Sequence, residues 1–283
     1  MHGPDILARF LTALGPADRF GVRWQYHSRS DRHSKVASWG VAFDLLLTSS
    51  LLQSHAAQGK VILGVNHEMR DFGTGRKKDL DLVIARPNGP IPGTGSSLKS
   101  LVAQYSIQLT EAQATTLAGL PDITIAPVGA VLIALEAKAC MTAHVKSLPR
   151  LYDELNSSHL CVHGASQQAL AIAYVQVNHS STFISPIINS KDIALGLDAK
   201  ITRHRQPADT LRVIDKVAEI PRRSTHTGTG FDAIGITVLD LVNDGTPVGL
   251  VTAPPAPQPG DHFHYGSMIV RMAHEYDATF SHI

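Results

Sequence analysis

The chain has 283 residues, of which 43% are hydrophobic and 17% are charged. This balance is typical of a folded globular protein and excludes a chain that is disordered throughout. The 25 basic and 24 acidic residues give a formal charge of +1, which excludes a strongly basic chain but allows a local basic face that contacts nucleic acid.

The cysteine count and the N-terminal residues indicate the cellular compartment in which the protein is expected. Two cysteines are too few for a disulfide framework or a four-cysteine zinc site. The first residues lack the basic start and apolar run of a signal peptide. No window holds the roughly 18 uninterrupted apolar residues of a membrane span. We therefore expect a reduced, cytoplasmic protein without a membrane partner.

Hydrophobic periodicity predicts an alternation of helices and strands. In chain order, the predicted elements are a helix at 4–14, a polar loop at 19–34, a helix at 36–52, a strand at 60–65, a turn at 71–78, a strand at 80–85, a loop at 86–97, a strand at 128–135, a helix at 142–155, a strand at 168–177, a helix at 210–220, strands at 234–241 and 247–252, and a closing helix at 267–278. This order predicts an α/β fold.

The predicted strand at 128–135 is continuously apolar and therefore favours a central position, covered on both faces. It is followed at once by Glu136-Ala137-Lys138, and alternation places Glu136 and Lys138 on the same face. Burying a carboxylate beside an ammonium group still costs free energy, which function is a common reason to accept. The alternative interpretation is an exposed ion pair at a strand end, which contributes little to stability.

A second group of acidic residues lies on the predicted strand at 80–85. Asp81 is the candidate partner of Glu136, and Asp79 could replace it or join it. Carboxylates are the oxygen ligands that Mg²⁺ prefers, the carbonyl of Ala137 could supply another, and we expect Mn²⁺ to substitute. Such a metal polarises a phosphate, while Lys138 orients water or stabilises developing charge. The alternative for Asp81 is an outward-facing polar position.

This pattern of residues resembles the signature of the PD-(D/E)XK, or restriction-endonuclease-like, nuclease superfamily. Asp81 stands for its Asp and Glu136-Ala137-Lys138 for its Glu-x-Lys. The resemblance implies a mixed sheet flanked by helices, with both motifs on adjacent strands. It also implies catalytic roles for Asp81, Glu136 and Lys138, with metal bound by Asp81, Glu136 and Ala137. Asp44 stands where an acidic residue often lies on the preceding helix of that family.

The resemblance covers about residues 36–178 of a single nuclease domain at 1–283, and leaves about 179–283 as a C-terminal elaboration. Two features depart from the family pattern. Leu80 precedes Asp81 where the family has a proline, and the long gap between Asp81 and Glu136 requires an insertion at about 86–127.

Three functions follow as expectations. The first is a magnesium-dependent endonuclease that cleaves DNA in restriction or anti-phage defence. The second is an effector nuclease of abortive infection that a cyclic oligonucleotide activates. The third is a non-catalytic nucleic-acid-binding protein that keeps the fold. In each, Arg76, Lys77 and Lys78 are candidates for contacting the DNA backbone, and cutting both strands favours a homo-oligomer.

Overall fold

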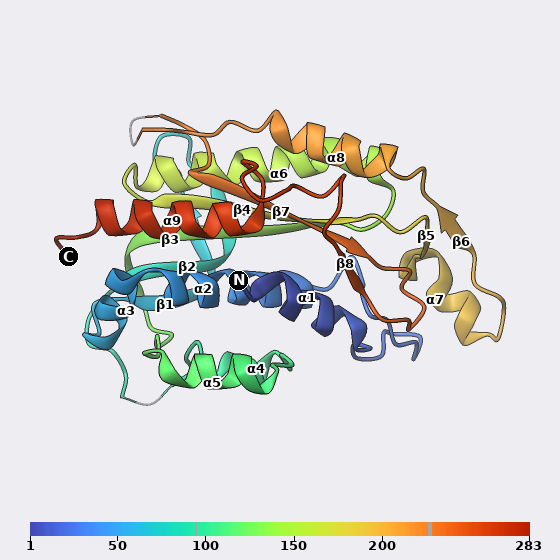
Figure 1. Cartoon of the computed structure of the whole chain (residues 1–283), viewed down its shortest axis with the longest axis horizontal. Coiled ribbons are helices and arrows are strands. Elements are labelled where there is room, and N and C mark those ends of the chain that lie inside the picture. The colour runs from blue at the N-terminus through green and yellow to red at the C-terminus, as the bar shows by residue number, and fades with distance from the viewer. Residues whose placement is uncertain (94, 226–227) are drawn as a thin grey trace.

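A computed structural model of the chain describes residues 1–93, 95–225 and 228–283. It is an α/β fold with a six-stranded mixed sheet and helices on both faces (Figure 1), which confirms the predicted fold class at that level. The strand order is β1-β2-β3-β4-β7-β8. β1, β2 and β3 are antiparallel, β3, β4 and β7 run parallel, and β8 is antiparallel to β7.

The bounds of the elements are as follows. The strands of the large sheet are β1 (Ile62–Arg70), β2 (Lys77–Pro87), β3 (Val128–Cys140), β4 (Leu170–Asn178), β7 (Ala233–Asp240) and β8 (Gly249–Val251). A small antiparallel sheet pairs β5 (Thr182–Ile184) with β6 (Ile201–Arg203). The helices are α1 (Gly3–Thr12), α2 (Arg32–Thr48), α3 (Ser50–Ala57), α4 (Leu101–Gln104), α5 (Glu111–Gly119), α6 (His144–Ala165), α7 (Pro186–Ala194), α8 (Ala208–Ala218) and α9 (Tyr265–Thr279).

The hydrophobic core lies on both faces of the central strands. Every residue of β4 and residues 131–137 of β3 are buried, as expected for strands that helices cover on both sides. One buried cluster joins Leu135 and Tyr174 to α1, α2 and α9. The other joins Ala134 and Val175 to α6 and α8. Figure 1 shows α6 and α8 above the sheet and α1 and α2 below it.

Two predicted elements differ from the structure. The helix at 36–52 is divided into α2 and α3 at Ser49, whose hydroxyl oxygen accepts a hydrogen bond from the Leu52 N–H and so caps α3. The strand at 128–135 continues to Cys140 as β3 because β4 pairs with it throughout, from Ile133 with Leu170 to Cys140 with Val177. The Glu-Ala-Lys motif therefore lies inside a strand and not beyond its end.

The predicted boundary at residue 178, between the core and the C-terminal elaboration, does not mark the end of the sheet. β7 lies in the segment expected to be a C-terminal elaboration, yet it pairs in parallel with β4, from Ile172 with Ala233 to Asn178 with Leu239. α9, from the same segment, packs into the buried cluster that α2 forms with the sheet. The insertion at 86–127 contains α4 and α5, and a capping box of Thr110 and Gln113 starts α5.

Among the described residues, no single helix is both long and apolar enough to span a membrane. α2 and α3 together have the required length and composition, but the pair is bent by 100°.

Candidate active site

β2 and β3 separate next to the predicted motif. Leu82 and Leu135 are the last paired residues at this end of the ladder, and Asp81 and Glu136 follow them on the two strands. β2 is also twisted here, because Leu80 and Leu82 are buried in opposite clusters although alternation would place them on the same face. Asn66 of β1, with a φ of 49°, lies opposite this twist.

The Asp81 side chain turns into the opening between the two strands. Its Oδ2 accepts a hydrogen bond of 2.7 Å from the N–H of Ala137, an amide that would bond to a backbone carbonyl of β2 if the ladder continued. Burial raises the pKa of Asp81, although this hydrogen bond, the charge of Lys138 and the Ser34 hydroxyl act in the opposite direction. A cation beside this carboxylate would restore its charged form.

Glu136 and Lys138 form an ion pair on the face of β3 that α6 covers. Lys138 Nζ lies 2.6 Å from Glu136 Oε1, and Lys78 Nζ lies 3.4 Å from the same oxygen. The Glu136 side chain is only 2% exposed, and its Oε2 is buried without a hydrogen-bond partner among the described residues. Burial raises the pKa of Glu136; Lys138 opposes this rise, and the nearby charge of Asp81 adds to it.

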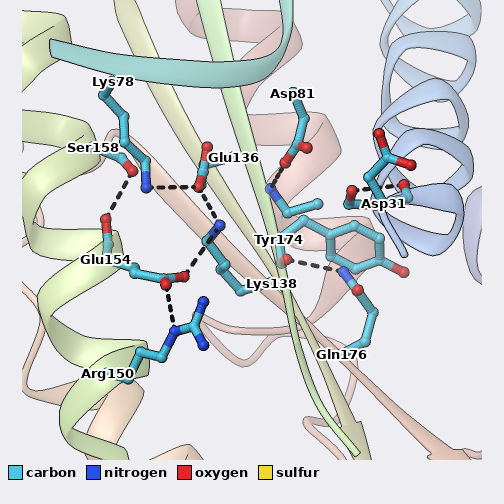
Figure 2. A network of polar contacts seen from close by, with 12 residues as sticks. Asp31, Lys78, Asp81, Glu136, Lys138, Arg150, Glu154, Ser158, Tyr174 and Gln176 are labelled. Atoms are coloured by element: carbon cyan, nitrogen blue, oxygen red, sulfur yellow. Dashed lines mark hydrogen bonds and ion pairs between the residues drawn. The ribbon is translucent and has the colours of Figure 1, made fainter. Parts of the chain in front are cut away.

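Glu154 of α6 completes the group and was not among the predicted site residues. Its Oε2 lies 3.3 Å from Lys138 Nζ, and its Oε1 lies 2.6 Å from Arg150 Nε one helical turn away. Burial lowers the pKa of Lys138, but the two glutamates outweigh burial and raise it. Figure 2 shows Glu136, Lys138 and Glu154 between β3 and α6, with Asp81 on the side of β3 that faces α2.

The structure therefore places Asp81, Glu136, Ala137 and Lys138 at the same end of the β2–β3 ladder, with the Asp81 side chain on the other side of β3 from the Glu136–Lys138 pair. Ala137 contacts Asp81 through its N–H, whereas metal binding by its carbonyl stays a prediction. Lys78 was expected to contact DNA from a surface turn. Because β2 already begins at Lys77, Lys78 instead points toward Glu136 and is 18% exposed.

Asp79 and the other two basic candidates lie outside this group. Asp79 is exposed. Lys77 pairs at the surface with Glu68, at 2.8 Å, and Arg76 is exposed in the turn before β2. Their predicted roles in DNA binding remain open, but none of the three side chains takes part in the contacts around Glu136.

Asp44 is placed away from the group, and the prediction of an acidic site residue on this helix is corrected accordingly. Its fully buried carboxylate accepts hydrogen bonds from the N–H groups of His2 and Gly3 and from the hydroxyl of Tyr265, at 2.8–2.9 Å. Asp44 thus stabilises the N-terminus of α1 and joins it to α9. The residues of α2 that reach the site are at its N-terminal end, where Ser34 contacts Asp81.

A cleft of about 590 Å³ opens beside Asp81, Lys138 and Glu154. Its floor is the C-terminal part of β3, from Ala137 onward, and Arg150 and Glu154 of α6 form one wall. The opposite wall is the segment at 26–34, which was predicted only as a polar loop. His33 in this wall has its pKa lowered to about 4 by burial and by the charge of Lys138, so its imidazole is neutral at neutral pH.

The donor set fits a magnesium ion. Among the described residues, no group of three or more His, Cys, Asp and Glu side chains is arranged to hold a metal. Mg²⁺, however, is commonly held by one or two carboxylates together with water and substrate phosphate. Asp81 and Glu136 supply two carboxylates, and the Oε2 of Glu136 is a buried acceptor for which none of the described residues provides a donor.

Comparisons with family models, curated proteins and solved structures give no match to this chain.

Proposed function

We propose that the chain is a metal-dependent endonuclease that hydrolyses DNA phosphodiester bonds, with Asp81, Glu136 and Lys138 at the reacting centre. One observation carries the proposal. Two carboxylates and an ammonium group from adjacent strands lie close enough to interact through their charges where those strands separate, and Asp81 and Lys138 line an open cleft. This arrangement supports the resemblance to the restriction-endonuclease-like superfamily, which implies these motifs on neighbouring strands of a mixed sheet.

The energetics favour a functional role over a structural one. A buried ion pair seldom adds net stability, because removing both charges from water offsets their attraction. Here burial raises the pKa of both Asp81 and Glu136, and one oxygen of Glu136 has no hydrogen-bond partner in the part of the chain that the structure describes. Carboxylates that are poorly stabilised by their own protein are suited to binding a divalent cation.

Hydrolysis joins a water oxygen to phosphorus and breaks the bond from phosphorus to the leaving oxygen, which takes up a proton. Bound Mg²⁺ would supply polarisation of the phosphate and a lower pKa for water. Asp81 and Glu136 would hold that cation. Lys138, fixed by Glu136 at 2.6 Å and by Glu154 at 3.3 Å, would orient the attacking water and stabilise the negative charge that develops on the phosphate.

Two more cations lie near the path of a bound strand. Lys78 points toward Glu136 from β2, and Arg150 projects into the cleft from α6 with its side chain largely exposed. Both can contact phosphate oxygens, for which lysine and arginine are the usual partners. Glu154 pairs with Arg150 on the wall of the cleft and with Lys138 on its floor, so it acts as a positioning residue.

The proposal is tested by incubating the purified full chain with supercoiled plasmid, single-stranded DNA and RNA, in Mg²⁺ or in EDTA. We expect cleavage of DNA in Mg²⁺, none in EDTA, and at least about a 100-fold loss of rate in Glu136→Gln and Lys138→Ala, the scale of removing one preorganised electrostatic group. Adding cyclic oligonucleotides to each reaction distinguishes an activated effector from a constitutive enzyme.

The Lys216–Glu219 pair on α8 provides the matched controls, because it is an ion pair of 2.7 Å at the surface. Lys216→Ala and Glu219→Gln should cleave at the wild-type rate. Binding of DNA without cleavage in any divalent metal would favour the non-catalytic alternative. Full activity in Glu136→Gln would refute the assignment of the site.

A further inference from the structure

The segment at 15–33 encloses a second cavity that opens beside the cleft. This loop cavity has a volume of about 260 Å³ and lies between the segment itself and Phe10 of α1. Tyr26, Arg29, Ser30 and His33 line both the loop cavity and the cleft. A ligand bound at Lys138 could therefore extend directly into the loop cavity.

The walls of the loop cavity are aromatic. Phe10, Trp24 and Tyr26 line it, and all three residues are buried, with 4–7% of their surface exposed. The ring of Tyr26 also packs against His33, with 4.8 Å between ring centroids. Aromatic faces of this kind stack on nucleobases of any sequence, because every base presents a π-face.

Positive side chains also outnumber negative ones in the lining of the loop cavity. The segment at 15–33 contains four arginines and two aspartates. Arg32 lies with its guanidinium carbon 4.9 Å from the centre of the Phe10 ring, and among the described residues it has no acidic partner within 4.0 Å. Burial and the neighbouring charge of Arg23 lower the pKa of Arg32, so the two guanidinium groups repel each other in a partly buried position.

The acidic residues of this segment are engaged elsewhere. Asp18 also lines the loop cavity. Its carboxylate accepts hydrogen bonds from the Trp24 indole and from the N–H groups of Phe20 and Val22. Asp31 pairs with Lys35 at 2.6 Å. The lining of the loop cavity therefore holds two guanidinium groups, those of Arg29 and Arg32, and one carboxylate, that of Asp18, and the excess of positive charge suits an anion.

We propose that the loop cavity binds an unpaired nucleotide of a DNA strand whose neighbouring phosphate lies in the cleft. The base would stack among Phe10, Trp24 and Tyr26, and Arg29 and Arg32 would contact the adjoining phosphates. This inference rests on the proposed nuclease function and narrows its substrate to DNA that is single-stranded, or locally unpaired, beside the bond that is cut. A base paired in a duplex is stacked between its neighbours and must leave that stack to enter a cavity.

The two tryptophans of the chain allow a binding test that does not depend on cleavage. Trp39 is fully buried in the core, whereas Trp24 lines the loop cavity. A short oligothymidylate, titrated in EDTA, should quench the tryptophan fluorescence by stacking on Trp24. A blunt duplex of the same length should bind more weakly and quench little. Equal quenching by both, or quenching by neither, would overturn the proposal.

Substitutions locate the binding. Arg32→Ala should weaken oligothymidylate binding by at least about fivefold, because it removes a charge-assisted hydrogen bond to a phosphate. Arg86→Ala, at an exposed position near the far end of β2, controls for the general loss of one charge and should change binding less than twofold. Equal effects of the two variants would refute a role for the loop cavity.

A second variant guards against misfolding of Arg32→Ala, because Arg32 is the first residue of α2. A methyl group added at Gly15 would lie 2.3 Å from Arg32 Nη1, so Gly15→Ala should displace the guanidinium and also weaken binding. An unchanged melting temperature shows that each variant is folded. Quenching without cleavage in any metal would contradict the nuclease proposal, whereas cleavage without quenching would contradict the loop cavity alone.

Discussion

Replacing Glu136 by glutamine distinguishes a catalytic carboxylate from a structural one, because the variant keeps the shape of the side chain and removes its charge. Breaking a fully buried ion pair costs about 3–5 kcal/mol when one charge is left without a partner. Lys138 would still have an acidic partner in this variant, because its side chain is 25% exposed and its Nζ lies 3.3 Å from Glu154 Oε2. The variant also removes a carboxylate whose pKa burial raises, which offsets part of the loss.

We therefore expect Glu136→Gln to lower the free energy of unfolding by only about 1–2 kcal/mol, while DNA cleavage falls at least about 100-fold. Urea denaturation followed by circular dichroism measures the first quantity, and initial rates of plasmid nicking measure the second. A loss of more than about 4 kcal/mol, with normal activity in the molecules that remain folded, would show that the pair is structural and would refute this reasoning.

Three further predictions concern residues outside the reacting centre. Asp44→Asn should destabilise the chain by about 2 kcal/mol, because the Asp44 carboxylate accepts two backbone hydrogen bonds and one from Tyr265. DNA cleavage by this variant well below its melting temperature should be unchanged. A folded but inactive variant would show that Asp44 belongs to the site. Burial and the neighbouring His163 lower the pKa of His159 from 6.5 to about 4, so stability present above pH 6.5 should fall by roughly 3 kcal/mol as the pH drops toward 4. His159→Gln should show a smaller fall in urea titrations over that range. Gly64→Ala should cost about 1–3 kcal/mol in the same assay, because the added methyl group would lie 2.6 Å from Val128 and 2.7 Å from Val83; wild-type stability would contradict the close packing of β1 on β2.

The central sheet and the pairing of Glu136 with Lys138 could be predicted because their signals are local. The apolar run before Glu136 indicates a covered central strand, and alternation alone places Glu136 and Lys138 on one face, as the 2.6 Å contact confirms. The separation of the strands at Asp81 could not be predicted, because it depends on pairing across two neighbouring strands.

The errors concern contacts between distant segments. Periodicity shows that Asp44 lies on a helix, but not that the N-terminus of α1, 41 residues earlier, binds its carboxylate. Glu154 had a local signal, since it forms an i, i+4 pair with Arg150 on a predicted helix, yet only the packing of α6 on β3 brings it to Lys138. In the same way, nothing within 15–33 indicates that this segment forms a wall of the cleft.

The central claim is that Asp81 and Glu136 bind one divalent cation together. Titration of the chain with Mn²⁺, followed by the electron paramagnetic resonance signal of the free ion, measures this directly. We expect one Mn²⁺ per chain in the wild type, binding at least about tenfold weaker in both Asp81→Asn and Glu136→Gln, and unchanged binding in Asp44→Asn. Wild-type Mn²⁺ binding in either of the first two variants would contradict the shared site.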